Sequence, residues 1–357
     1  MKIETLFELA LETRASDLHL RVGMPPILRI DGRLSQQDYP PLTNNDITLM
    51  LDEITSLEQK ERFSRDKELD FAYALAHKAR FRINVMRQRN TISIACRMLP
   101  FVVPSIDKLD LPPICKDLIL QPRGLILITG PTGVGKSTTM AAMIRHLNEN
   151  RECNIITIED PIEYHHQNIK SMIAQRELGE DTDSFHTALV RALRHDPDVI
   201  VVGEMRDLDT ISAAITAAET GHLVMSTLHT IDAVQTIDRM IDVFPPNQQS
   251  QIRLQISQAL LAILSQTLLP RASGKGMIAA FEIVLANPSI RNLIREGRTP
   301  EIPTYVKIHS EAGAQSLDES LANLVQSNQV TREAAMQRTS DPKRLAKLLE
   351  SRQNKDI

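Results

Sequence analysis

The sequence of 357 residues is poor in aromatic side chains, with no tryptophan, four tyrosines and eight phenylalanines. A protein that grips single-stranded nucleic acids by stacking their bases needs more rings than this. The 41 basic residues are balanced by 45 acidic ones, which gives a formal net charge of -4 and argues against a surface that is basic throughout. We therefore expect no nucleic-acid partner, and a DNA translocase is disfavoured.

Cysteines and long apolar runs are scarce as well. The three cysteines, Cys96, Cys115 and Cys153, form no CxxC pair, so we expect a reduced, cytoplasmic protein with neither a disulfide framework nor a structural zinc. The longest nearly uninterrupted apolar run begins at Ala259 and is interrupted by polar residues after Leu264. This run is too short to span a bilayer.

Turn signals and hydropathy divide the chain into parts. Residues 1–99 mix a short amphipathic helix with strand-like alternation, which indicates a small α+β domain. Five prolines between residues 100 and 122 predict a linker. Residues 123–276 alternate short aliphatic runs with helical stretches, which predicts an α/β core with a parallel sheet covered on both faces. Residues 277–357 are expected to be helical. The aliphatic runs span residues 125–129, 155–158, 199–202 and 223–227.

A glycine-rich segment fits the phosphate-binding pattern GxxxxGK(S/T). It follows the aliphatic run 125–129 and precedes a helical stretch at 138–149. Backbone N–H groups of such a loop surround phosphate oxygens, Lys136 is expected to reach the β- and γ-phosphates, and the Ser137 hydroxyl can ligate Mg²⁺. We therefore predict ATP and Mg²⁺ as ligands. The predicted nucleotide contacts are Gly130, Pro131, Thr132, Gly133, Val134, Gly135, Lys136, Ser137 and Thr138.

Acids and histidines stand at the ends of the other aliphatic runs, and ligands of open α/β sheets bind at the carboxyl ends of strands. We expect Glu204 to be the general base for water attack. Glu163 is the second candidate, and either acid can hold Mg²⁺ through water. His229 and His222 bracket one run, and either imidazole can sense the γ-phosphate. The alternatives are solvated loop acids and structural histidines.

The first domain contains a basic hairpin. No acid occurs between Asp70 and Asp107. Two alternating stretches joined by a two-residue turn at Arg89-Asn90 would place Arg82 directly opposite Arg97. Because opposed like charges destabilise a sheet, we expect a nucleotide phosphate held by the second domain to lie between them, as with an arginine finger. This arrangement implies a ring with sites at subunit interfaces. A solvated hairpin face is the alternative.

Four segments together resemble the Walker A, Asp box, Walker B and His box of the secretion and type IV pilus ATPases. They span residues 130–137, 156–163, 198–207 and 220–229, and Ser289–Glu296 resembles the retraction motif of that superfamily. Two departures are Ser289 in place of alanine and Val134 in place of serine, and residues 100–111 look shorter than the usual linker.

The resemblance implies a PAS-like N-terminal domain followed by a RecA-like P-loop ATPase domain with a helical C-terminal region. It also implies a homohexamer that hydrolyses Mg-ATP to drive pilus retraction and twitching motility. The expected partner is an inner-membrane platform protein, with pilin affected indirectly. The chain would then lie at the cytoplasmic face of the inner membrane and touch it only peripherally. The resemblance also supports Arg82 and Arg97 as arginines that complete a nucleotide site.

Three other functions stay open at this point: an accessory retraction ATPase, a nucleotide-switched regulatory binding protein, and a P-loop kinase. Within the retraction-like motif, Ile290, Leu293 and Ile294 share one helical face, and Arg291 and Arg295 share another. Such a helix suits docking. Ordinary core packing with solvated arginines is the alternative.

Overall fold

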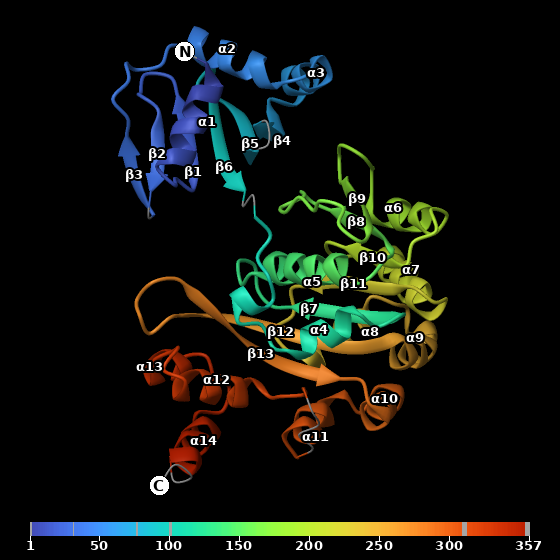
Figure 1. Ribbon diagram of the computed structural model, residues 1–357. Helices are drawn as coiled ribbons and strands as arrows, with labels where there is room; N and C mark the ends of the chain where they lie inside the picture. Colours follow the sequence, from blue (N-terminus) through green and yellow to red (C-terminus); the bar gives the residue numbers. More distant parts are fainter. Residues whose placement is uncertain (1, 31, 76–77, 100–101, 309–312, 354–357) are drawn as a thin grey trace. The chain divides into compact units, whose positions relative to one another are not determined.

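The structure, a computed structural model, describes the chain apart from residues 1, 31, 76–77, 100–101, 309–312 and 354–357 (Figure 1). The chain divides into two compact units, residues 1–102 and 103–357. The expected α/β class, with a smaller α+β unit ahead of a larger unit of sheet and helices, is confirmed.

The first unit is a six-stranded sheet in the order β3-β2-β1-β6-β5-β4, covered by three helices. Apolar side chains of the helices pack against one face of the sheet, where the Phe7 ring stacks on Phe81 with centroids 4.1 Å apart. The elements are α1 Ile3–Glu12, β1 Asp17–Arg21, β2 Ile27–Ile30, β3 Arg33–Gln36, α2 Asn44–Ile54, α3 Leu57–Asp66, β4 Glu68–Leu75, β5 Ala79–Gln88 and β6 Thr91–Leu99.

The basic hairpin of strands β5 and β6 has the predicted register. Arg89 and Asn90 adopt left-handed backbone angles, with φ of 45° and 61°, as a two-residue hairpin turn requires. Gln88 therefore pairs with Thr91, and Arg82 pairs with Arg97.

The second unit is built on a seven-stranded sheet in the order β13-β12-β7-β11-β10-β8-β9. Its strands are parallel except for the antiparallel pair β12 and β13. The strands are β7 Gly124–Thr129, β8 Asn154–Glu159, β9 Met172–Glu177, β10 Val199–Val202, β11 Leu223–Leu228, β12 Leu260–Pro270 and β13 Met277–Leu285. The four predicted aliphatic runs are all strands of this sheet.

Helices cover both faces of the second sheet. Side chains of α4 and α5 pack on one face, and side chains of α6, α7, α8 and α9 pack on the other. Every residue of β7, β10 and β11 is therefore buried, which explains why these strands read as unbroken aliphatic runs. The helices are α4 Ile114–Ile119, α5 Lys136–Asn150, α6 Phe185–Ala192, α7 Leu208–Glu219, α8 Ala233–Asp242 and α9 Pro246–Ala259.

Two expected boundaries need correction. Of the expected linker, residues 100–122, residues 100–101 lie outside the described residues and residues 103–122 belong to the second unit. Residues 103–122 form η1 Asp107–Leu109 and α4, and they bury Leu111 and Cys115 against the sheet. Prolines lie between these short helices, and Pro113 directly precedes α4. The helical region begins at Pro288 rather than at residue 277, because residues 277–285 form strand β13. A short apolar run does not distinguish a buried strand from a buried helix.

The C-terminal part is helical as expected. Its elements are α10 Pro288–Arg295, η2 Thr299–Glu301, α11 Ile302–Ile308, α12 Leu317–Gln326, α13 Arg332–Met336 and α14 Pro342–Gln353. Leu321 of α12 and Leu345 of α14 pack against Leu269 and Ile278 of the β12–β13 hairpin. Over the described residues, no helix combines the length and the apolar character that crossing a bilayer requires.

Candidate nucleotide site

The loop between β7 and α5 has the backbone that a phosphate cradle needs. Gly130, Gly133 and Gly135 have φ of 142°, 82° and 89°, a region that side chains other than glycine rarely adopt. Gly130 is also closely approached: a Cβ there would lie 2.5 Å from the main-chain oxygen of Gln266. The loop ends at the N-terminus of α5, where the partial positive charge of the helix favours an anion.

Lys136 lies inside this loop. Its Nζ donates to the carbonyl oxygens of Gly130 at 2.6 Å and Pro131 at 3.1 Å, and the residue is 8% exposed. Burial lowers the pKa of Lys136, and the charges of Glu204 and Glu163 partly offset this. The ammonium is therefore held where phosphate oxygens bound in the loop would meet it.

Glu204 and His229 meet at the edge of the sheet where β7, β10 and β11 end. Val202 pairs with Ser226 in parallel register, so the residues beyond these strands emerge side by side. His229 Nε2 lies 3.1 Å from Glu204 Oε1. On the other side of the ring, Nδ1 lies 3.3 Å from Thr132 Oγ1 and 3.4 Å from Lys136 Nζ.

The neighbours of His229 assign its tautomer. Because an ammonium has no lone pair to offer, Nδ1 must accept from Lys136, which leaves the ring proton on Nε2 to be donated to Glu204. One imidazole thus joins the phosphate loop to the predicted general base.

Arg206 is the second partner of Glu204. Its guanidinium lies 2.8 Å from Glu204 Oε2. Partial burial raises the pKa of Glu204, but the hydrogen bonds from Arg206 and His229 and the positive charge of Arg206 outweigh burial and lower the pKa overall. Glu204 is therefore ionised near neutral pH and can orient a water molecule through its lone pairs.

Glu163 and Ser137 are the candidate residues for holding Mg²⁺ beside the phosphate loop. Glu163 acts electrostatically on Lys136, which places its carboxylate near the loop. Thr138 Oγ1 lies 3.0 Å from the hydroxyl of Tyr164, and this contact ties the segment carrying Glu163 to α5. A hydroxyl and two carboxylates are hard oxygen donors that suit Mg²⁺. Among the described residues, no group of three or more His, Cys, Asp or Glu side chains is arranged to hold a metal, so phosphate oxygens and waters would complete the shell.

His222 is not brought to this site. It precedes β11, whose first residue, Leu223, pairs with Gly124 at the start of β7. The phosphate loop begins at the other end of β7, which is about 17–20 Å away at ~3.3 Å per residue. The His222 Nδ1 lies 2.9 Å from the carbonyl of Ala217, and its own carbonyl accepts from Gly124 N. The predicted sensing role of His222 at this loop is therefore wrong.

Arg82 and Arg97 lie on the exposed face of the first sheet, and an acid lies beside one of them. Asp17 on β1 pairs in register with Arg97, whose Nε lies 2.9 Å from Asp17 Oδ1. Arg29 Nε lies 3.6 Å from Asp17 Oδ2. Burial opposes ionisation of Asp17, but hydrogen bonds from Ser16 and Arg97 lower its pKa overall. Part of the charge that was expected to attract an external anion is thus balanced within the unit.

Sequence reasoning missed two residues that touch the site, Arg206 and Gln266. Arg206 follows Glu204 by two residues, but nothing in the pattern distinguishes it from a solvated arginine. Gln266 is buried on β12 and donates from Nε2 to the carbonyl of Val134. The sequence feature that could have identified Gln266 is the polar pair Ser265-Gln266, which interrupts the apolar run that begins at Ala259.

The retraction-like motif forms α10, and its apolar face is turned inward. Ile290 and Ile294 are at most 1% exposed, and Leu293 is 9% exposed. The docking interpretation of this face is wrong, because these residues pack in the core of the second unit.

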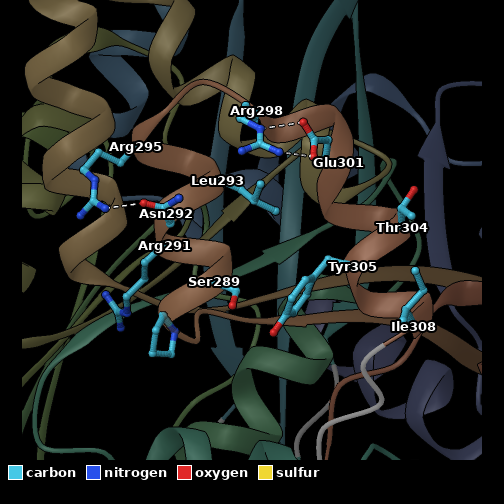
Figure 2. Close-up of a pocket in the computed structure, with 11 residues that line it drawn as sticks. Ser289, Arg291, Asn292, Leu293, Arg295, Arg298, Glu301, Thr304, Tyr305 and Ile308 are labelled. Carbon is cyan, nitrogen blue, oxygen red and sulfur yellow. Dashed lines mark hydrogen bonds and ion pairs between the residues drawn. The ribbon is translucent and has the colours of Figure 1, made fainter.

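The other face of α10 borders a groove of about 920 Å³ that is shared with α11 (Figure 2). Arg291 donates to the carbonyls of Ser257, Gln258 and Leu260, where α9 ends and β12 begins. Arg295 bonds the side chain of Asn292. The two arginines of the motif therefore have different surroundings, although they are four residues apart.

Comparisons with known proteins cover nearly the whole chain. The sequence model of the type II/IV secretion system protein family matches residues 1–349. The chain is 42% identical over 342 residues to the type IV pilus retraction ATPase PilT of Pseudomonas aeruginosa, which covers 96% of this chain and 99% of that protein. It is 38% identical to the type IV pilus ATPase PilU of the same organism, over 94% of this chain and 88% of that protein. The crystal structure of the pilus retraction motor PilT with bound ADP matches with a TM-score of 0.91 and 44% identity, over 97% of this chain and 99% of that chain.

Proposed function

The chain belongs to the type II/IV secretion system protein family, and we propose that it is an ATPase that drives type IV pilus retraction. The observation that carries the proposal is the site at one sheet edge, where the phosphate loop, His229 and Glu204 are joined by hydrogen bonds. The match to a retraction ATPase over 96% of the chain supports the choice of retraction.

The residues of the site have separate roles in the transfer of the γ-phosphoryl group to water. Backbone N–H groups of the loop and Lys136 hold the β- and γ-phosphates. Glu204 orients the attacking water and accepts its proton, and His229 stands between the loop and this base. Ser137, with Glu163 and Glu204 through water, would hold Mg²⁺, which neutralises phosphate charge when bound.

Phosphate release by the purified chain tests the enzymatic part. We expect multiple turnovers of ATP, and we expect Glu204→Gln to lower kcat by about 10²–10⁴ because the general base is lost. Asp209→Asn is the matched control, because Asp209 is exposed on α7 five residues away. Wild-type turnover in Glu204→Gln would refute the assigned base. A single turnover that leaves ADP bound would favour a nucleotide switch, and a phosphorylated acceptor would favour a kinase.

The motor part of the proposal includes a homohexamer that engages an inner-membrane platform protein from the cytoplasmic side and acts on pilin indirectly. Deleting the gene should leave excess surface pili and abolish twitching motility. Loss of pili would instead indicate extension. An accessory retraction ATPase is the second candidate, and it predicts that pili still retract with normal force after the deletion.

Arg82 and Arg97 are proposed to contact a nucleotide phosphate in the assembled ring. They oppose each other in register on an exposed sheet face. Of these two arginines, Arg97 is the one that forms an ion pair with Asp17. A phosphate would relieve the remaining repulsion between them.

A further inference from the structure

Gln266 occupies a position on β12 that adjoins the phosphate loop. The preceding residue, Ser265, pairs in parallel register with Thr129, the last residue of β7, and their hydroxyls are 3.0 Å apart. Gln266 therefore lies beside the first residue of the loop. It is 3% exposed, and a buried amide must find partners for both its donor and its acceptor.

Both ends of the Gln266 amide bond the loop and the helix that follows it. Nε2 donates to the carbonyl oxygen of Val134 at 2.5 Å, and Oε1 accepts from Thr139 Oγ1 at 2.8 Å. The main-chain oxygen of Gln266 fills the space that a Cβ at Gly130 would need. The Nε2, the Oε1 and the main-chain oxygen of Gln266 therefore all contact the phosphate loop or the helix that follows it.

The bond to Val134 sets the direction of the next N–H group. In a planar trans peptide, the C=O and N–H point in opposite directions. Holding the Val134 carbonyl toward β12 therefore turns the N–H of Gly135 away from β12. Gly135 precedes α5 with φ of 89°, and its N–H has no acceptor among the hydrogen bonds recorded for the described residues. A donor at a helix N-terminus is suited to an anion.

We propose that Gln266 is a positioning residue that aims the Gly135 N–H at the β-phosphate of a bound nucleotide. This inference rests on the proposed function, since it concerns the same loop. It assigns a role in nucleotide affinity to a strand that follows the four recognised motifs in the sequence. Thr139, by contrast, anchors the other end of the amide without setting the Val134 peptide directly.

Three variants separate positioning from packing. Gln266→Met keeps the length of the side chain and removes both hydrogen bonds. Gln266→Glu keeps an acceptor for Thr139 but removes the donor to Val134. Thr139→Val has a side chain of nearly the same shape, removes the donor to Gln266 Oε1 and leaves the Val134 bond in place, and it serves as the matched control. Affinity for ADP is measured by calorimetric titration of the full-length protein, with melting temperatures recorded without nucleotide and KM and kcat recorded for ATP.

We expect Gln266→Met to bind ADP about tenfold more weakly, because one charge-assisted hydrogen bond is misdirected. Gln266→Glu should bind ADP at least as weakly, because its carboxylate also repels the phosphate. KM for ATP should rise by a similar factor while kcat at saturation changes by less than about twofold, since the β-phosphate contact is made equally before and during reaction. Thr139→Val should stay within about twofold of the wild-type affinity. If Gln266→Glu is insoluble, Gln266→Met, which buries no charge, carries the test.

Two results would overturn the inference. One is Gln266→Met binding ADP as tightly as the wild type while melting at a lower temperature, because Gln266 would then only pack. The other is an equal loss in Thr139→Val, because the Val134 bond would then be irrelevant. A wild-type protein that binds no ADP would remove the proposed function itself, and this inference with it.

Discussion

Replacing Arg291 by methionine should destabilise the second unit substantially, although arginines on helix surfaces are usually dispensable. The last carbonyls of a helix have no donor within that helix. Arg291 supplies donors to the Ser257 and Gln258 carbonyls near the end of α9 and to that of Leu260 at the start of β12, at 2.6 Å for Gln258 and 2.9 Å for Leu260. It also places a positive charge at the negative end of the helix dipole.

The magnitude follows from these contacts. A hydrogen bond with a charged donor contributes about 1.5–3 kcal/mol, so three such bonds set an upper limit of about 9 kcal/mol. Two effects reduce this value: partial burial opposes the charge and lowers the pKa of Arg291, and the freed carbonyls regain water on the half-exposed side. We expect a net loss of about 3 kcal/mol, which lowers Tm by about 6–12 °C for a unit of this size.

Thermal unfolding of the full-length chain, followed by circular dichroism, measures this loss, and hydrogen exchange localises it to residues 257–261. Arg295→Met is the control, because Arg295 is exposed on the same helix and bonds the Asn292 side chain. Its effect should stay within about 0.5 kcal/mol, as for ordinary surface substitutions. Equal shifts in Tm for the two variants, in either direction, would refute the assignment of Arg291 as a cap.

Burial lowers the pKa of His166 to about 4, so the unfolded chain takes up this proton first and stability should fall by about 3 kcal/mol as pH drops from about 6.5 to 4. His166→Gln should flatten the dependence of the urea midpoint on pH, the exposed His165→Gln should not, and identical slopes would contradict the prediction. Arg82→Ala and Arg97→Ala should lower ATP turnover while ADP affinity stays within about twofold; normal turnover in both would end their proposed role.

The strands that sequence analysis found and those it missed differ in burial. β7, β10 and β11 lie between helices on both faces, so every position is apolar enough to read as a continuous run. β9 is an edge strand of polar and apolar residues, and no run marks it. β13 carries an apolar pattern that suits either a strand or a helix, and its long pairing with β12 decides in favour of a strand.

Strand direction explains which site residues could be predicted. Glu204 and His229 come after their strands, and parallel strands bring the residues beyond their carboxyl ends to one edge. The same rule excludes His222, which precedes β11, because a residue before a parallel strand emerges at the opposite edge. Position relative to the strand therefore carried more information than residue type. No such rule reaches Gln266, because its contact depends on β12 lying beside β7, and strand order is a property of the folded sheet.

Strand order also determines how the loop is held. β7 leads into the phosphate loop and lies between β11 and β12. From the β11 side, His229 contacts Thr132 and Lys136 through Nδ1 and donates a hydrogen bond from Nε2 to Glu204. From the β12 side, Gln266 holds the Val134 carbonyl. A phosphate entering the loop would compete with His229 for the Lys136 ammonium, whereas it would leave the Gln266 bond intact. The β11 contact is therefore the one that responds to the nucleotide, and the β12 contact is the one that keeps the loop ready for it.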